Sequence, residues 1–160
     1  MSELKDLILR EPRRTLAVAE SLTCGNVQAY IGRISGASEF FLGGITAYSL
    51  EQKVNLLGVN RDAAEKVNCV SAEIAEQMAR GAANSFGADL ALATTGYAEA
   101  AEEHDVTVPF AWWALAHREG KSWVLQSHRV ECPGANRVEV QASITLAVIT
   151  GLLEHLRATK

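Results

Sequence analysis

The chain has 160 residues, 48% of them apolar, and a formal net charge of −4 at pH 7. This length and composition favour one globular domain over residues 1–160 with a single substantial core. Lys and Arg are scattered, which argues against a nucleic-acid partner. No run of ~18 apolar residues is present, which argues against a membrane partner.

The cysteines and histidines form no disulfide or metal-binding pattern. The chain has three cysteines, Cys24, Cys69 and Cys132, which lie far apart in the sequence. An odd number of widely spaced cysteines is typical of reduced thiols in a cytoplasmic protein. None of them has the spacing of a zinc ligand relative to a histidine. The charged segment 1–12 lacks the apolar run of a signal peptide. We therefore expect a soluble, cytoplasmic protein that binds no metal.

The first sixty residues predict three helices and two strands. Leu4, Leu7 and Ile8 have helical spacing, and Pro12 ends this short opening helix. The segment 15–19 is apolar on both faces and too short for a core helix, so it favours a buried strand. The next elements are a helix over about 25–33, a strand over 41–48 and a helix over 51–57 that ends at Gly58.

The rest of the chain predicts two longer helices and three strands. Ser71 is a suitable N-cap for a helix that ends at Gly87, and Asn136 is a suitable N-cap for the last helix. Between these helices lie predicted strands at 89–95, 110–116 and 123–130, the last two forming a hairpin. This alternation predicts an α/β fold, a three-layer α/β/α sandwich with a mixed, mostly parallel sheet.

Hydroxyl side chains follow two of the predicted strands. Ligands of open α/β sheets bind beyond the carboxyl ends of the strands. Ser21 and Thr23 precede a helix that starts near Gly25, whose free N–H groups suit a phosphate or carboxylate. Thr95 and Gly96 end the third strand. The plainer interpretation is that Ser21 and Thr23 only cap the helix, and spacing alone favours it.

Ser38 lies in the loop before the second strand and needs a base before it can act as a nucleophile. Lys53 and Tyr48 are candidate bases, because a partly buried lysine loses proton affinity. The plainer interpretations are a turn serine and a solvated lysine. The sequence pattern does not decide between them.

Five segments, in this order, resemble the CinA carboxyl-terminal domain family. They are AESLTCG (19–25), GAS (36–38), GGITAYSLEQKVNLLGV (43–59), VSAEIAEQMARGA (70–82) and ADLALATTGYA (88–98). The resemblance implies the family's α/β/α fold and a homo-oligomer, commonly a dimer. Characterised members are nicotinamide mononucleotide deamidases of NAD salvage, which hydrolyse the carboxamide to a carboxylate and ammonia. They need neither a metal nor an organic cofactor.

The resemblance also implies roles for individual residues. Ser38 would be the nucleophile, Lys53 the base that activates it, and Tyr48 a group that assists proton transfer or orients the amide. Arg137 would pair with the substrate phosphate. The remaining substrate-binding residues would be Ser21, Thr23, Gly25, Thr95 and Gly96.

The chain departs from the family pattern where substrate would bind. Cys24 replaces a glycine that lets the backbone approach the ligand, and Gln141 stands where a second arginine is common. The family's glycine-rich loop is TGYAEAAEE (95–103) here. If this loop closes over a phosphate, Glu99, Glu102 and Glu103 would repel it.

Two hypotheses follow. The first is an amidohydrolase whose partner is a small-molecule nucleotide, and the presence of Ser38, Tyr48 and Lys53 favours it. The second is a catalytically silent or re-purposed member that binds a nucleotide or another small ligand, or acts on a less anionic amide. The altered loop favours this second hypothesis.

Overall fold

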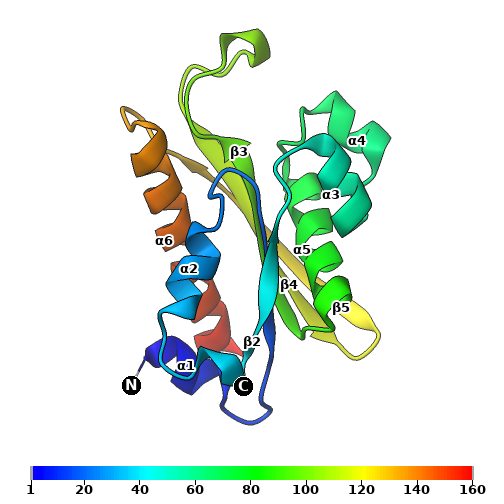
Figure 1. The fold of residues 1–160 in the computed structure, drawn as a ribbon, viewed down its shortest axis with the longest axis vertical. Coiled ribbons are helices and arrows are strands. Elements are labelled where there is room, and N and C mark those ends of the chain that lie inside the picture. The colour runs from blue at the N-terminus through cyan, green and yellow to red at the C-terminus, as the bar shows by residue number, and fades with distance from the viewer. Residues whose placement is uncertain (1, 160) are drawn as a thin grey trace.

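The strands form one five-stranded sheet in a computed structural model that describes residues 2–159 (Figure 1). Their spatial order is β2-β1-β3-β4-β5. β1 pairs in parallel with β2 and β3, whereas β4 pairs antiparallel with β3 and β5, so β4 runs against the other four strands. The strands are β1 (Leu16–Glu20), β2 (Phe41–Thr46), β3 (Leu90–Tyr97), β4 (Phe110–Glu119) and β5 (Ser122–Glu131).

Helices cover both faces of the sheet and complete the predicted three-layer sandwich (Figure 1). One face carries α1 (Glu3–Ile8), α2 (Asn26–Gly32) and α6 (Arg137–Ala158). The other carries α3 (Leu50–Leu57), α4 (Arg61–Lys66) and α5 (Ala72–Phe86). Two short 3₁₀ helices are η1 (Ala37–Glu39) and η2 (Glu102–His104). Within residues 2–159, no helix combines the length and apolar character needed to cross a membrane.

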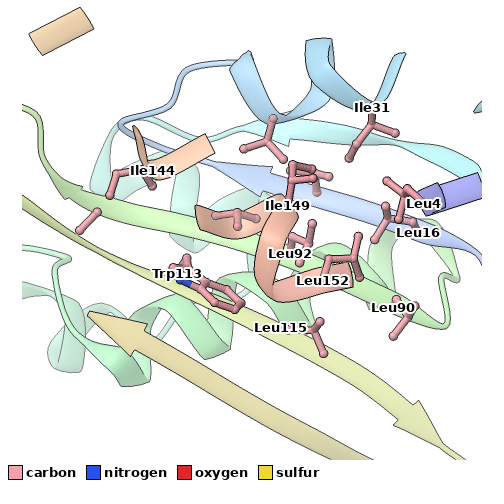
Figure 2. Packing of buried hydrophobic residues seen from close by; sticks show 14 of the residues in the cluster. Leu4, Leu16, Ile31, Leu90, Leu92, Trp113, Leu115, Ile144, Ile149 and Leu152 are labelled. Atoms are coloured by element: carbon pink, nitrogen blue, oxygen red, sulfur yellow. The ribbon is translucent and has the colours of Figure 1, made fainter. Parts of the chain in front are cut away.

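The central strands carry large side chains on one face and alanines on the other. Leu90 and Leu92 of β3 pack toward α6, where Figure 2 shows them near Leu152. Ala91 and Ala93 of the same strand pack toward α5. Burial of each leucine contributes about 1.5–3 kcal/mol. The alanine face lets α5, which also presents alanines, lie close to the sheet.

Close packing on this alanine face also fixes the position of α3. A Cβ added at Gly81 of α5 would lie 2.0 Å from the carbonyl oxygen of Leu57, the last residue of α3. The two helix backbones therefore touch. This contact positions α3, and with it Lys53, relative to the sheet.

The structure confirms each predicted helix and strand and adds α4. Asn60 caps α4, since its side chain accepts a hydrogen bond from the Ala63 N–H. The helix has six residues, and Ala64 is its buried one. So short a helix with one buried residue has no apolar periodicity that sequence reasoning could detect.

Candidate functional site

A cavity of about 480 Å³ lies beyond the carboxyl ends of β1, β2 and β3. Open α/β folds bind their ligands at this end of the strands. Its polar and ionisable lining residues are Ser21, Tyr48, Lys53, Asn68, Cys69, Thr95, Tyr97, Glu99, Glu103, His104 and Arg137.

Lys53 and Ser21 meet at the floor of this cavity. Lys53 Nζ donates a hydrogen bond to Ser21 Oγ at 2.9 Å and another to the Tyr48 carbonyl oxygen at 3.0 Å. Ser21 follows β1 directly, and its N–H donates to the Thr94 carbonyl oxygen of β3. Ser49 caps α3 through the Gln52 N–H, which places Lys53 in the first turn of that helix. The serine is thus held by the sheet and the lysine by a capped helix.

Lys53 is buried, with 2% of its surface exposed. Burial lowers the pKa of its ammonium group, and the nearby Cys69 side chain opposes that shift. Burial also raises the pKa of the Cys69 thiol, against the effect of Lys53. A lysine with a lowered pKa beside a serine hydroxyl suits proton abstraction from that hydroxyl.

Ser38 does not share this cavity. It is exposed on η1, which precedes β2, whereas Tyr48 and Lys53 follow β2. The six residues of β2 lie between the two ends, a length of about 20 Å at ~3.3 Å per residue. Figure 1 shows the start of β2 and α3 at opposite ends of the sheet. The prediction that Ser38 and Lys53 lie within hydrogen-bond reach is therefore wrong. The two residues lie at opposite ends of the strands.

The N-terminus of α2 is occupied by the protein's own carboxylate. Glu20, fully buried at the end of β1, accepts hydrogen bonds from the N–H groups of Gly25, Val27 and Gln28 at 2.8–3.0 Å. Thr23 Oγ1 also donates to this carboxylate, at 2.6 Å. The predicted anion site is thus filled, and Thr23 and Gly25 hold Glu20 and do not line the cavity.

Sequence reasoning missed Glu20, and one signal could have revealed it. An acidic residue ends an otherwise apolar, buried strand and precedes a helix. A buried carboxylate needs partners, and the free N–H groups of a helix start supply them.

Thr95 and Gly96, which the resemblance assigns to substrate binding, line the cavity. The Thr95 hydroxyl donates to the Cys69 carbonyl oxygen at 2.6 Å, which ties β3 to the turn before α5. A Cβ at Gly96 would lie 2.5 Å from the Ala111 Cα of β4. Pairing with β4 is therefore what requires glycine at this position.

Arg137 lies at the mouth of the cavity, at the first position of α6. Its Nη2 donates to Glu99 Oε1 at 2.5 Å, and its Nη1 donates to the Tyr48 hydroxyl at 3.4 Å. The predicted phosphate ligand and Tyr48 are thus brought together with an acidic residue of the β3–β4 loop.

A family model described as the CinA C-terminal domain matches residues 1–156 of the chain. The chain belongs to this family. A CinA-like protein from Rippkaea orientalis is 34% identical over 151 residues, which are 94% of this chain and 35% of that protein. A CinA-like protein from Picosynechococcus sp. is 47% identical over 91 residues, which are 57% of this chain and 22% of that protein. The chain thus spans about a fifth to a third of these CinA-like proteins.

Solved CinA-superfamily structures share the fold over nearly the whole chain. A competence-damaged protein (CinA) superfamily protein from Klebsiella pneumoniae has a TM-score of 0.88 and 26% identity, covering 98% of this chain and 95% of that one. The competence/damage-inducible protein CihA from Agrobacterium tumefaciens has a TM-score of 0.82 and 24% identity, covering 98% and 97%.

In this CinA-family domain, the β3–β4 loop extends past the end of β3 (Figure 1) and is fastened on two sides of the cavity. On the side of α6, Glu99 binds Arg137. On the side of α4 and α5, Asn68 Nδ2 contacts His104 Nε2 of the loop at 3.1 Å and donates to the hydroxyl of Tyr97, the last residue of β3, at 3.1 Å. Among residues 2–159, no group of three His, Cys, Asp or Glu side chains is arranged to hold a metal ion.

Proposed function

We propose that this CinA-family domain is an amidohydrolase that converts a nicotinamide-type carboxamide to a carboxylate and ammonia. Ser21 is the nucleophile in this proposal and Lys53 is its base, so Ser21 takes the role that the family resemblance gave to Ser38. The observation that carries the proposal is the hydrogen bond of 2.9 Å between Lys53 Nζ and Ser21 Oγ inside a cavity. A volume of about 480 Å³ suits a small molecule.

The chemistry has two stages. Neutral Lys53 takes the proton of Ser21 Oγ as this oxygen attacks the amide carbon. The Lys53 ammonium then lies beside the oxygen anion that develops, stabilises it, and gives the proton to the departing ammonia. A water molecule next attacks the acyl–Ser21 ester, with Lys53 again accepting a proton, which it returns to Ser21 Oγ. The products are a carboxylate and ammonia, and the enzyme is regenerated.

Two further features support the proposal. Burial lowers the pKa of Lys53, which favours the neutral amine that a base requires. The Lys53 contact with the Tyr48 carbonyl oxygen fixes the direction of the amine toward Ser21.

The test measures ammonia release from nicotinamide mononucleotide and from its dephosphorylated nucleoside. Ser21→Ala should lower the turnover of the better substrate by at least about a thousandfold, because it removes the nucleophile. Ser38→Ala is the matched control and should keep turnover within about twofold. Loss of activity in Ser38→Ala with activity kept in Ser21→Ala would overturn the assignment. Binding of either compound without turnover in the wild type would favour a silent binding protein.

A further inference from the structure

Three groups suited to an anion at this end of the strands are bound by the protein's own carboxylates. The Arg137 guanidinium is bound by Glu99 at 2.5 Å. The N-terminus of α2 is filled by Glu20. The N-terminus of α6 is closed by a capping box, in which Glu139 Oε2 accepts from the Asn136 N–H at 2.8 Å. Three places suited to an anion are thus occupied.

The charge of the lining leads to the same conclusion. Within the described chain, the Lys and Arg side chains that line the cavity are Lys53 and Arg137. Lys53 lies at the floor, where its donors point to Ser21 and the Tyr48 carbonyl oxygen. Glu99 and Glu103 line the same cavity, so its carboxylate side chains equal its Lys and Arg side chains in number. The cavity therefore offers no excess positive charge to a ligand.

A phosphate monoester carries a charge of about −1.5 to −2 at pH 7. To reach Arg137, it would have to displace Glu99 or lie beside it. Displacing Glu99 would break its ion pair with Arg137. A phosphate that bound beside Glu99 would place two negative charges a few ångströms apart. A sugar hydroxyl or a cationic ring would neither break this ion pair nor be repelled by Glu99.

We infer that the carboxamide substrate of this domain carries no phosphate, and that Glu99, through its ion pair with Arg137, is the residue that excludes phosphorylated substrates. The inference rests on the proposed amidohydrolase function and names the class of its substrate. That class comprises uncharged or cationic carboxamides of nucleoside size, as opposed to nucleotides.

The experiment compares nicotinamide mononucleotide with its dephosphorylated nucleoside, using kcat/KM for ammonia release. The wild type should prefer the nucleoside by about tenfold or more. Glu99→Gln should shrink that preference by about tenfold, because it removes the carboxylate and keeps the side-chain size. Glu102→Gln is the matched control, since it removes a charge of the same loop from a residue outside the cavity lining, and it should keep the preference within twofold.

A wild type that prefers the nucleotide would overturn the inference, and so would an unchanged preference in Glu99→Gln. If the wild type hydrolyses neither compound, the proposed function fails, and the same comparison is made by equilibrium binding. Tighter binding of the nucleoside than of the nucleotide, with a difference in affinity that Glu99→Gln reduces, would support the exclusion of phosphate without the proposed function. Equal affinities, tighter nucleotide binding, or binding of neither compound would overturn it.

Discussion

Lys53 Nζ and Ser21 Oγ are 2.9 Å apart, although thirty-two positions separate the two residues in the chain. Ser21 follows β1, and Lys53 lies in the helix that follows β2. Because β1 and β2 are parallel neighbours, the segments after them emerge at one edge of the sheet. The pair is thus a consequence of strand order.

The pH dependence of the reaction should report the ionisation of Lys53. Burial lowers the pKa of this lysine below the usual 10.5, and the base is active only when neutral. We expect kcat/KM to rise with pH through that lowered pKa and then to level off. Lys53→Arg should lower the rate by about 10²–10⁴-fold, since arginine stays protonated. Lys66→Arg, at an exposed lysine, is the control, and a rate that falls with rising pH would contradict the assignment.

Glu20→Gln should destabilise the fold. The carboxylate accepts three backbone N–H groups and the Thr23 hydroxyl, and a glutamine amide would turn an NH₂ group toward some of these donors. Hydrogen bonds to buried charged groups contribute about 1.5–3 kcal/mol each, so we expect a loss of about 2–4 kcal/mol in unfolding free energy. Urea denaturation measures it, with the exposed Glu154→Gln as control. Equal midpoints for the two variants would refute this role.

Gly81→Ala should force α3 and α5 apart. The new Cβ would lie 2.0 Å from the backbone oxygen of Leu57. A backbone atom cannot avoid this clash by rotation of a side chain. We expect a loss of about 1–3 kcal/mol in stability, together with reduced activity as α3 moves Lys53 away from Ser21. Gly32→Ala is the matched control, because its Cβ meets open space and alanine favours helix. Thermal unfolding and turnover of both variants provide the comparison.

Stability should fall in mild acid because of a buried histidine pair. His155 Nε2 lies 3.0 Å from His117 Nδ1. Burial lowers the pKa of both residues, as does the nearby Arg14, while Glu119 opposes the shift. Near pH 6.5, these two histidines therefore bind more protons in the unfolded chain than in the folded chain.

The unfolding free energy should accordingly decrease as pH falls from 7 toward the lowered pKa values of the pair. His117→Gln removes one titrating member, so its stability should depend less on pH over that interval. His128→Gln, at an exposed histidine outside the pair, should keep the wild-type dependence. Urea unfolding at several pH values makes the measurement, and identical slopes for all three proteins would count against the prediction.

The sequence by itself predicted the five strands, the helices other than α4, and the sheet covered by helices on both faces. Short apolar runs at Leu16–Glu20 and Leu90–Tyr97 predicted buried strands, because local pattern and length are sufficient for that inference. Alternation of these strands with capped helices then predicted the layered fold. The motifs likewise pointed to the CinA family, which the family model shows.

Only the tertiary structure decided which serine meets Lys53 and which carboxylates meet the anion-binding groups. Ser38 precedes a strand and Ser21 follows one, so they lie at opposite ends of the strands, and Lys53 meets Ser21, whereas the family resemblance had pointed to Ser38. Glu99 meets Arg137 across thirty-eight positions. Such contacts depend on how strands are ordered and where loops fold back, and neither is encoded in local spacing.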